Sequence, residues 1–284
     1  MRIADLAGIE ASPALLATRD ALDANAPQDY RELAALLAHR WRESPPRRVG
    51  LSGGQGAGKS TLAALIESAC SQVKLRCCVL SLDDFYLRRE DRLTLAERVH
   101  PTLATRGPPG THDIPALRTA MESLFEPGEV KTPIFDKGID DRSGSRVLRG
   151  PFDLVIVEGW CIGAAPSADS DLESPINALE LQLDADGVGR RYVNEQLRRD
   201  YAPWTEELDY LAFLKVPSLD AVRAWRLDQE RERSADQRMS AAEVTQFVEH
   251  YERISLAMLR DVPLHAQAVI ELDSAHRVSG LSFC

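Results

Sequence analysis

Residues 49–60 read Val-Gly-Leu-Ser-Gly-Gly-Gln-Gly-Ala-Gly-Lys-Ser, and from Gly53 onward they satisfy the pattern G-x4-G-K-[ST]. This pattern is typical of phosphate binding, because glycines let the backbone take positive φ and wrap closely around a polyphosphate. Lys59 supplies a cation for the β and γ oxygens, and the hydroxyl of Ser60 is placed to ligate Mg²⁺. The residues expected to contact the nucleotide are Gly53, Gly54, Gln55, Gly56, Ala57, Gly58, Lys59, Ser60 and Thr61.

The sequence on either side of this loop supports the same prediction. A β-like run, residues 48–52, precedes it, and apolar residues at helical spacing follow it (Leu62, Leu65, Ile66 and Ala69). A helix that begins near Gly58 would direct its free N–H groups and the positive end of its dipole at the same anion. The alternative, a glycine-rich turn with an incidental lysine, leaves this strand and helix unexplained. We therefore expect the chain to bind ATP together with Mg²⁺.

The composition is ordinary for a globular enzyme: of 284 residues, 44% are hydrophobic and 27% are charged. The net charge of −10 argues against non-specific binding to nucleic acids, which needs an excess of lysine and arginine. No run of about 18 apolar residues is present, so no membrane span is expected. Five cysteines without metal-ligand spacing and the lack of a basic-then-apolar leader predict a cytoplasmic protein with reduced thiols. Monomer and homodimer both remain open.

Five apolar runs predict strands at residues 49–52, 76–82, 153–158, 211–216 and 269–272. They show little alternation between apolar and polar residues, which is typical of strands covered on both faces in a parallel sheet. The predicted fold class is therefore α/β, a mainly parallel sheet with helices on both faces. Residues 1–46 are expected to form an N-terminal helical extension, with helices over 13–22 and 30–41, and residues 47–284 the main domain.

Acidic residues follow two of these strands. Asp83 and Asp84 close the second, and Glu158 closes the third. A carboxylate beside a phosphate loop can orient an attacking alcohol and accept its proton, and we assign that role to Asp83. Asp84 is expected to hold metal-bound water or substrate, and Glu158 to complete the Mg²⁺ shell with Ser60. The alternative for the two aspartates is a helix cap or a solvated turn. The alternative for Glu158 is a buried glutamate paired with a neighbouring basic side chain.

A rigid, turn-rich loop carries further candidate groups. Residues 106–113 read Arg-Gly-Pro-Pro-Gly-Thr-His-Asp, so proline and glycine fix the backbone that presents the polar side chains. Arg106 could clamp a carboxylate or phosphate with two hydrogen bonds, and His112 could donate to a hydroxyl. Thr111 and Asp113 could instead cap the helix that is expected to follow.

Two other segments have charged side chains in suggestive positions. Asp136 and Lys137 end an extended segment and are assigned to the acceptor, although a surface hairpin with charged ends explains them nearly as well. Residues 220–240 are expected to form a helical lid whose arginines meet charge on the transferred phosphoryl group. We choose Arg226 as the catalytic arginine of the lid from a set of three (Arg223, Arg226 and Arg233). Pairs such as Arg226–Glu230 would equally suit a solvated helix face.

Taken together, these motifs resemble the D-glycerate 3-kinase family, in the phosphoribulokinase/uridine kinase branch of the P-loop kinases. The stretches that carry the resemblance are 50–61, 81–87, 106–113, 135–137, 158–160, 193–195 and 225–230. The match as a whole extends over about residues 49–262. The resemblance implies a P-loop NTPase fold with a five-stranded parallel core, MgATP as phosphoryl donor, and the 3-hydroxyl of D-glycerate as acceptor. It also implies that Asp83 is the catalytic carboxylate. Residues 163–175 match no motif of the family, and Gly138 stands where plant-like members are expected to have serine.

The leading hypothesis is therefore a small-molecule kinase. A nucleoside pocket would need aromatic stacking, and an aromatic content of 6% favours a small polar acid instead. Other acceptors within the class are a nucleoside, pantothenate or a sugar phosphate. The alternative from another class is a nucleotide-gated ATPase switch, which would position water rather than an alcohol.

Overall fold

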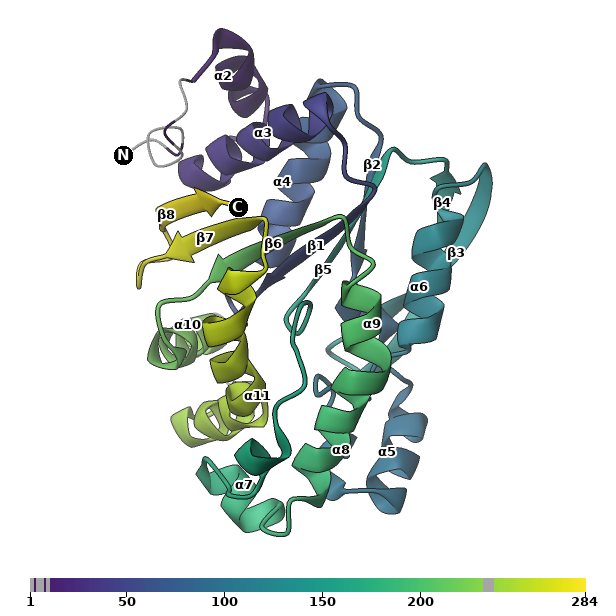
Figure 1. Cartoon of the computed structure of the whole chain (residues 1–284), viewed down its shortest axis with the longest axis vertical. Coiled ribbons are helices and arrows are strands. Elements are labelled where there is room, and N and C mark those ends of the chain that lie inside the picture. Colours follow the sequence, from purple (N-terminus) through teal and green to yellow (C-terminus); the bar gives the residue numbers. More distant parts are fainter. Residues whose placement is uncertain (1–2, 4–7, 9–10, 232–237) are drawn as a thin grey trace.

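The computed structural model describes residues 11–231 and 238–284, together with Ile3 and Gly8. Its centre is a six-stranded sheet in the order β2-β5-β1-β6-β7-β8 (Figure 1). The strands are β1 (Arg48–Gly53), β2 (Cys77–Ser81), β5 (Leu154–Gly159), β6 (Tyr210–Lys215), β7 (Ala268–Leu272) and β8 (Val278–Phe283). The first five pair in parallel, which confirms the five predicted strands and the α/β fold class. The sixth, β8, pairs antiparallel with β7 and was not predicted, because serine and glycine interrupt its apolar residues.

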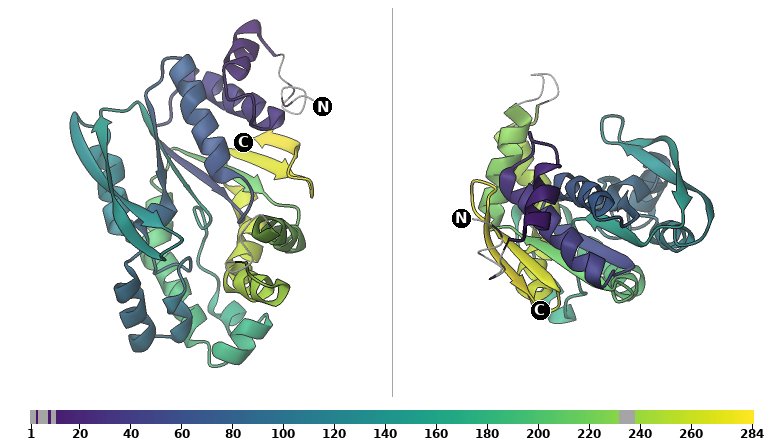
Figure 2. Two further views of the ribbon diagram at one scale, coloured as in Figure 1. Left: turned by 180° about the vertical axis from the view of Figure 1, so that it is seen from behind. Right: turned by 90° about the horizontal axis from the view of Figure 1, so that it is seen from above.

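Helices cover both faces of the sheet, which explains why its strands read as continuous apolar runs. Leu154 and Ile156 of β5 belong to one buried cluster, and Val155 and Val157 between them belong to another. Helices α3 (Gln28–Glu43) and α4 (Lys59–Gln72) contribute to the first cluster, and α6 (Ile114–Ser123) contributes to the second. Figure 2 shows these helices on either side of the sheet.

The remaining helices surround this core. They are α2 (Pro13–Asp20), α5 (Arg89–Arg98), α7 (Ala178–Leu183), α8 (Val188–Gln196), α9 (Ala202–Thr205), α10 (Leu219–Arg231) and α11 (Ala241–Asp261), a π-helical turn η4 (Leu197–Tyr201), and the 3₁₀ turns η1 (Leu82–Phe85), η2 (Pro101–Ala104), η3 (Asp169–Leu172) and η5 (Val262–Leu264). Among the described residues, no helix combines the length and apolar character needed to cross a membrane. Part of the predicted lid, residues 232–237 with Arg233, lies outside the described residues.

The glycine loop joins the central strand directly to a helix, as expected. β1 ends at Gly53, and Gly58 in the left-handed region (φ 79°) leads into α4. A Cβ at Gly58 would lie 2.9 Å from the Tyr30 ring, so both the φ angle and the close packing favour glycine there. The predicted stripe of Leu62, Leu65 and Ile66 is buried against the sheet.

A two-stranded hairpin stands apart from the main sheet. It consists of β3 (Gly128–Asp136) and β4 (Asp141–Gly150), which pair antiparallel with an irregularity at Ile134/Phe135. The Asp84 carboxylate accepts from the N–H of Phe135 at 3.1 Å, and Arg146 donates to the Val79 carbonyl at 2.8 Å. These contacts hold the hairpin beside the end of β2, with its connecting turn toward the site.

The helices before β1 are packed into the core of the sheet domain. α3 contacts α4, and Leu33, Leu37 and Trp41 are at most 2% exposed. These side chains belong to the same buried cluster as β1 residues Val49 and Leu51. Residues 28–43 therefore complete one face of the sheet.

This packing predicts that Leu37→Ala destabilises the whole domain. The substitution leaves a cavity in a fully buried site and should lower the free energy of unfolding by about 2–5 kcal/mol, measured by urea titration. Arg42→Ala, at an exposed position of the same helix, is the control and should change it by about 0.5 kcal/mol or less. A small loss for Leu37→Ala would contradict a shared core.

Candidate active site

A cavity of about 350 Å³ lies at the carboxyl ends of β1, β2 and β5, where open parallel sheets place their ligands. Among the predicted residues it is lined by Gln55, Gly56, Gly58, Lys59, Ser60, Thr61, Asp83, Arg106, Lys137, Glu158 and Arg226. Segments far apart in sequence therefore meet at one site. Of the other predicted loop residues, Gly53 and Gly54 line a smaller neighbouring space, and Ala57 is fully buried.

The phosphate loop has the backbone and charge expected for binding an anion. Gly56 and Gly58 have φ of 73° and 79°, and α4 begins directly after them. The Lys59 ammonium donates to the Gly54 carbonyl at 2.9 Å and so lies across the loop. Burial lowers the pKa of Lys59, while the charges of Glu158 and Asp83 oppose that shift. Its positive charge in this enclosed position is well placed to meet phosphate oxygens.

Glu158 and two serine hydroxyls form a cluster of oxygen ligands beside the loop. The Glu158 carboxylate is 6% exposed and accepts from Ser60 Oγ at 3.0 Å and from Ser81 Oγ at 2.7 Å. Hard oxygen donors of this kind suit Mg²⁺, which retains water and takes few protein ligands. The residues that fit a magnesium site are therefore Ser60 and Glu158. Ser81 was not predicted, although it precedes the acidic pair directly.

Asp83 faces the cavity and carries two partners. Lys137 Nζ lies 2.6 Å from one carboxylate oxygen, and the Tyr86 hydroxyl donates to the other at 2.9 Å. Burial raises the pKa of Asp83, but the ion pair with Lys137 and the hydrogen bonds that the carboxylate accepts together lower it more, so the pKa falls below the usual value. Asp83 is therefore ionised and oriented at neutral pH, as a group that accepts a proton must be.

Two of the predicted residues lie elsewhere. Asp84 does not line the cavity: its carboxylate accepts from the Phe135 N–H, and burial raises its pKa. The expectation that Asp84 binds metal or substrate is not supported, because the carboxylate is used to hold the hairpin. Asp136 accepts from the N–H of Gly138 at 2.7 Å and caps the turn of that hairpin, whereas its neighbour Lys137 reaches into the site.

The two predicted arginines line the cavity and are both paired. Arg106 contacts the Asp140 carboxylate and lies over the Phe135 ring at 5.8 Å. Arg226 of α10 pairs with Glu230 at 2.7 Å. Arg223 contacts Asp220 and Glu252 and does not line the cavity. Of the two described arginines of that set, Arg226 lines the cavity, and its part in catalysis stays a prediction.

His112 lies just behind the cavity and is bonded through one ring nitrogen. The Tyr201 hydroxyl accepts from the Gly110 N–H at 3.1 Å and lies 2.7 Å from His112 Nδ1. The other ring nitrogen, Nε2, is a buried atom that has no partner among the described residues. Burial lowers the pKa of His112 to about 4, and the ring stacks on Tyr86 with centroids 4.4 Å apart. His112 is therefore a buried, neutral imidazole close to Asp83.

Aromatic side chains that we did not assign to the site form another wall. Trp160, Phe247 and Tyr251 line the cavity, and the Tyr251 hydroxyl donates to the Arg106 carbonyl at 2.9 Å. The Trp160 indole donates to the Gly107 carbonyl at 3.1 Å. Trp160 directly follows the Glu158-Gly159 pair, which is a usable signal, but Phe247 and Tyr251 look like any apolar stripe on a helix. Asp113 caps α6, the alternative noted for it.

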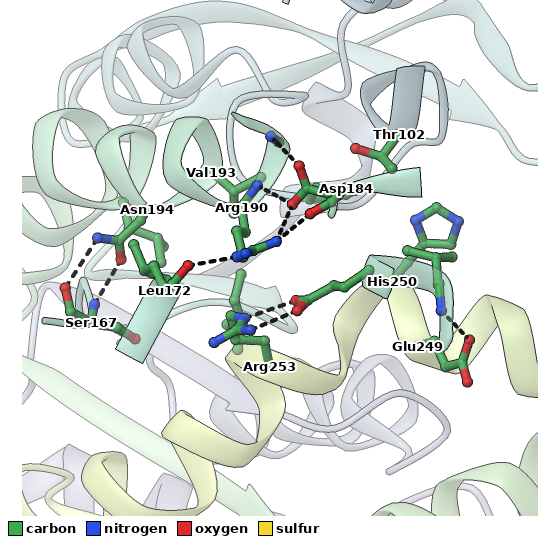
Figure 3. A pocket seen from close by; sticks show the side chains of 16 residues that line it. Thr102, Ser167, Leu172, Asp184, Arg190, Val193, Asn194, Glu249, His250 and Arg253 are labelled. Atoms are coloured by element: carbon green, nitrogen blue, oxygen red, sulfur yellow. Dashed lines mark hydrogen bonds and ion pairs between the residues drawn. The ribbon is translucent and has the colours of Figure 1, made fainter. Parts of the chain in front are cut away.

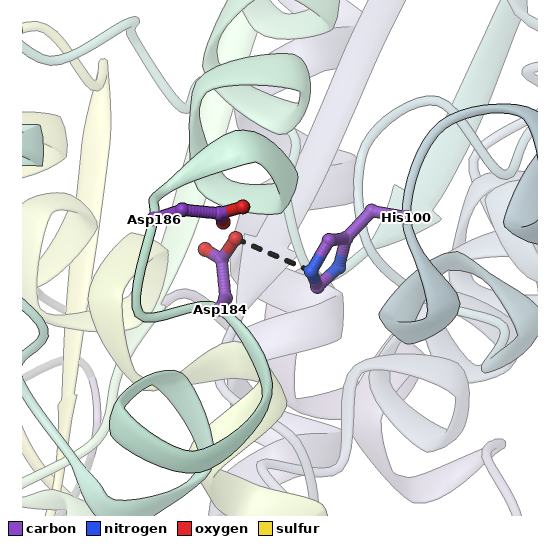
Figure 4. A group of neighbouring side chains, drawn as sticks. All are labelled: His100, Asp184 and Asp186. Carbon is purple, nitrogen blue, oxygen red and sulfur yellow. Dashed lines mark ion pairs between the residues drawn. The ribbon is translucent and has the colours of Figure 1, made fainter.

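A second, smaller cavity of about 60 Å³ contains charged residues that are all paired (Figure 3). Arg190 donates to the Asp184 carboxylate and to the carbonyl of Leu172, and Arg253 pairs with Glu180 at 2.6 Å. Figure 4 shows His100 and Asp186 beside Asp184. Because Asp184 already accepts from the Gly189 and Arg190 N–H groups at the start of α8, this cluster is explained as structural.

The central sheet, the phosphate loop and the facing carboxylates define a P-loop kinase. No model of a known protein family matches the chain. The chain is 33% identical over 223 residues to "Uncharacterized kinase mug58" of Schizosaccharomyces pombe, covering 74% of this chain and 79% of that protein. The resemblance to D-glycerate 3-kinases is confirmed as a resemblance, and the chain belongs to a family of ATP-dependent P-loop kinases.

Two further comparisons concern members whose names include a substrate. "D-glycerate 3-kinase, chloroplastic" of Arabidopsis thaliana is 30% identical over 222 residues, which cover 73% of this chain and 46% of the plant protein. The structure of D-glycerate 3-kinase from Cryptococcus neoformans superposes with a TM-score of 0.73 at 24% identity, covering 91% of this chain and 100% of that one. The second comparison shows the same fold over nearly the whole chain.

The burial of His112 predicts a loss of stability in mild acid. Its folded pKa of about 4 lies below the ordinary 6.5, so between these values the unfolded chain binds a proton that the folded chain excludes. Stability is therefore retained above about pH 6.5 and falls as the pH drops toward 4. From pH 7 to 5 the contribution is about 2 kcal/mol.

Urea titrations at the two pH values test this. The His112→Gln variant has no titrating group at this site and should lose less stability between pH 7 and pH 5 than the natural chain. Equal losses in the two proteins would contradict the assignment of a buried neutral imidazole.

Proposed function

We propose that the chain transfers the γ-phosphate of MgATP to the 3-hydroxyl of D-glycerate, giving 3-phosphoglycerate. The observation that carries this proposal is the juxtaposition of Asp83 and Lys137 in the cavity of the phosphate loop. A hydroxy acid has one group for each of them: a hydroxyl that needs a proton acceptor and a carboxylate that needs a cation.

The acceptor side is built to exchange its own ion pair for the substrate. Lys137 is 61% exposed at its side chain, so the ammonium can move from Asp83 to an incoming carboxylate at small desolvation cost. Arg106 offers a second cation at the same cavity, and its side chain is 27% exposed. His112 does not line the cavity, and the contact expected between it and a hydroxyl of the acceptor stays a prediction.

The remaining residues have roles that follow from their positions. Asp83 would orient the attacking hydroxyl and take its proton, while Lys59 and Arg226, on the wall of the same cavity, would meet the phosphate oxygens of the donor. Ser60 and Glu158 would hold the magnesium ion, which, when bound, neutralises charge on the phosphates. Because little covalent chemistry falls to the protein, positioning and charge supply most of the rate.

One of the relatives supports this choice of acceptor by its name. The Arabidopsis relative carries D-glycerate in its name, whereas the relative of S. pombe is named only as a kinase. The small polar cavity wall formed by Asp83, Lys137 and Arg106 also favours a small anionic alcohol over a nucleoside.

An acceptor panel tests the proposal. The purified chain is incubated with MgATP and, in turn, D-glycerate, L-glycerate, uridine, pantothenate and a sugar phosphate, and ADP formation is followed. D-glycerate should stimulate ADP formation most strongly, and 3-phosphoglycerate should be detected as the product. If another compound of the panel stimulates ADP formation most strongly, that compound is the acceptor and D-glycerate is not. ATP hydrolysis that needs no acceptor would indicate an ATPase switch.

Asp83→Asn tests the role of the carboxylate. The amide keeps the shape of the side chain but cannot accept the proton, so kcat should fall by about 10²- to 10⁴-fold while the Kd for MgATP stays the same. Asp84→Asn is the matched control one residue away, and because its side chain bonds the Phe135 N–H, it should retain most of the activity. Undiminished turnover of Asp83→Asn would remove this residue from catalysis.

A further inference from the structure

Two carbonyl groups of the phosphate loop accept hydrogen bonds from side chains far away in the sequence. The Tyr30 hydroxyl donates to the Ala57 carbonyl at 2.7 Å, and His276 Nε2 lies 2.9 Å from the Gly56 carbonyl. Both side chains lie outside residues 49–262, the span of the family resemblance. Neither lines the cavity, so both contact the loop from its outer side.

Tyr30 is a well-defined donor. It lies in the first turn of α3 and is 4% exposed, and its ring packs so closely on Gly58 that a Cβ there would lie 2.9 Å from it. Burial raises the pKa of Tyr30, and the charge of Asp29 acts in the same direction, so the hydroxyl keeps its proton. A carbonyl can only accept, so the hydroxyl proton is directed at Ala57.

His276 is also fixed by its surroundings. It follows β7 in the turn to β8, has φ of 60°, and stacks on Trp225 of α10 with ring centroids 3.7 Å apart. The Trp225 indole in turn donates to the carbonyl of Ser274 in the same turn at 2.9 Å. Because the Gly56 carbonyl accepts, Nε2 of His276 must carry a proton.

The two contacts are joined behind the loop. The Asp29 carboxylate accepts from the Val278 N–H at 2.8 Å, which ties the start of α3 to the start of β8 (Figure 1). Residues near both ends of the described chain therefore form one continuous support for the outer side of the loop.

We propose that Tyr30 and His276 are positioning residues that pre-form the phosphate loop for nucleotide. In a planar trans peptide the C=O and the following N–H point in opposite directions. Holding the Ala57 carbonyl outward therefore turns the Gly58 N–H toward the cavity that Gly58 lines. Holding the Gly56 carbonyl leaves the Ala57 N–H to close a turn on the Gly54 carbonyl, at 3.3 Å.

The consequence for binding is entropic. A loop with four glycines has many accessible conformations. If the protein does not restrict them beforehand, the nucleotide must do so on binding, and the lost conformational entropy weakens its affinity. The inference rests on the nucleotide binding of the proposed function but not on its acceptor, so failure of D-glycerate as substrate leaves it intact.

Titration calorimetry with MgADP tests the role of Tyr30. Tyr30→Phe removes the hydroxyl and keeps the ring, and it should raise the Kd for MgADP about fivefold, the size expected for one hydrogen bond. Tyr210→Phe makes the same chemical change in the same buried cluster, but at the start of β6, away from the loop. It should leave the Kd unchanged, whatever it does to the Tm.

A pair of variants that differ by one methylene tests His276. Asn tolerates positive φ but is too short to reach Gly56, so His276→Asn should weaken MgADP binding about fivefold. His276→Gln keeps a donor at the right reach and should restore affinity. The double variant of Tyr30→Phe and His276→Asn should bind about 20-fold more weakly than the natural chain.

These measurements separate positioning from general stability. Variants that remain folded at the assay temperature, with a lowered Tm but a Kd equal to that of the natural chain, would overturn the proposal. So would equal affinities of the Asn and Gln variants. A raised Kd for MgADP in Tyr30→Phe, alongside an unchanged Kd in Tyr210→Phe, supports it.

Discussion

The constraint on which the structure depends is the central place of β1 between two parallel neighbours. Its residues pair with β5 on one side and with β6 on the other, and both faces are covered by helices. Because β1 is held by a strand on each side and by helices on each face, its carboxyl end has one defined position, and the glycine loop begins there. The neighbouring ends of β2 and β5 then bring Asp83 and Glu158 to the same cavity, because parallel strands end at the same edge.

The charged side chains that line the cavity are compensated by ion pairs within the protein. Lys137 neutralises Asp83, Glu230 pairs with Arg226, and Asp140 pairs with Arg106. Isolated charges in a partly enclosed cavity would be costly, so each has a partner of opposite sign. An incoming phosphate or carboxylate can take the place of the acidic partner of a lysine or arginine. Binding of an anionic substrate is then an exchange of partners, with a smaller net cost of desolvation than filling an uncharged pocket.

The sequence was informative where one physical requirement determines residue type. The glycine loop, the parallel strands and the acids that end them follow from backbone geometry and burial, and the fold was confirmed. Less was evident where several roles share a residue type. Asp84 and Asp136 are acids near a site, yet they bond backbone N–H groups of the hairpin, and only tertiary structure distinguishes them from Asp83. Tyr86, Phe247 and Tyr251 were missed because buried aromatic residues on helices and turns usually serve packing alone.

The two sides of the cavity are carried by two different parts of the fold, the main sheet and the hairpin of β3 and β4. The triphosphate side rests on the sheet, where any change of register would disturb six strands. Lys137, by contrast, stands on an excursion between β2 and β5 that shares no strand pairing with the sheet. Under the proposed function, substitutions, insertions and deletions in that excursion would change the acceptor side of the cavity and leave the phosphate loop unaltered. The preference for an acceptor could then diverge among relatives that bind the same nucleotide.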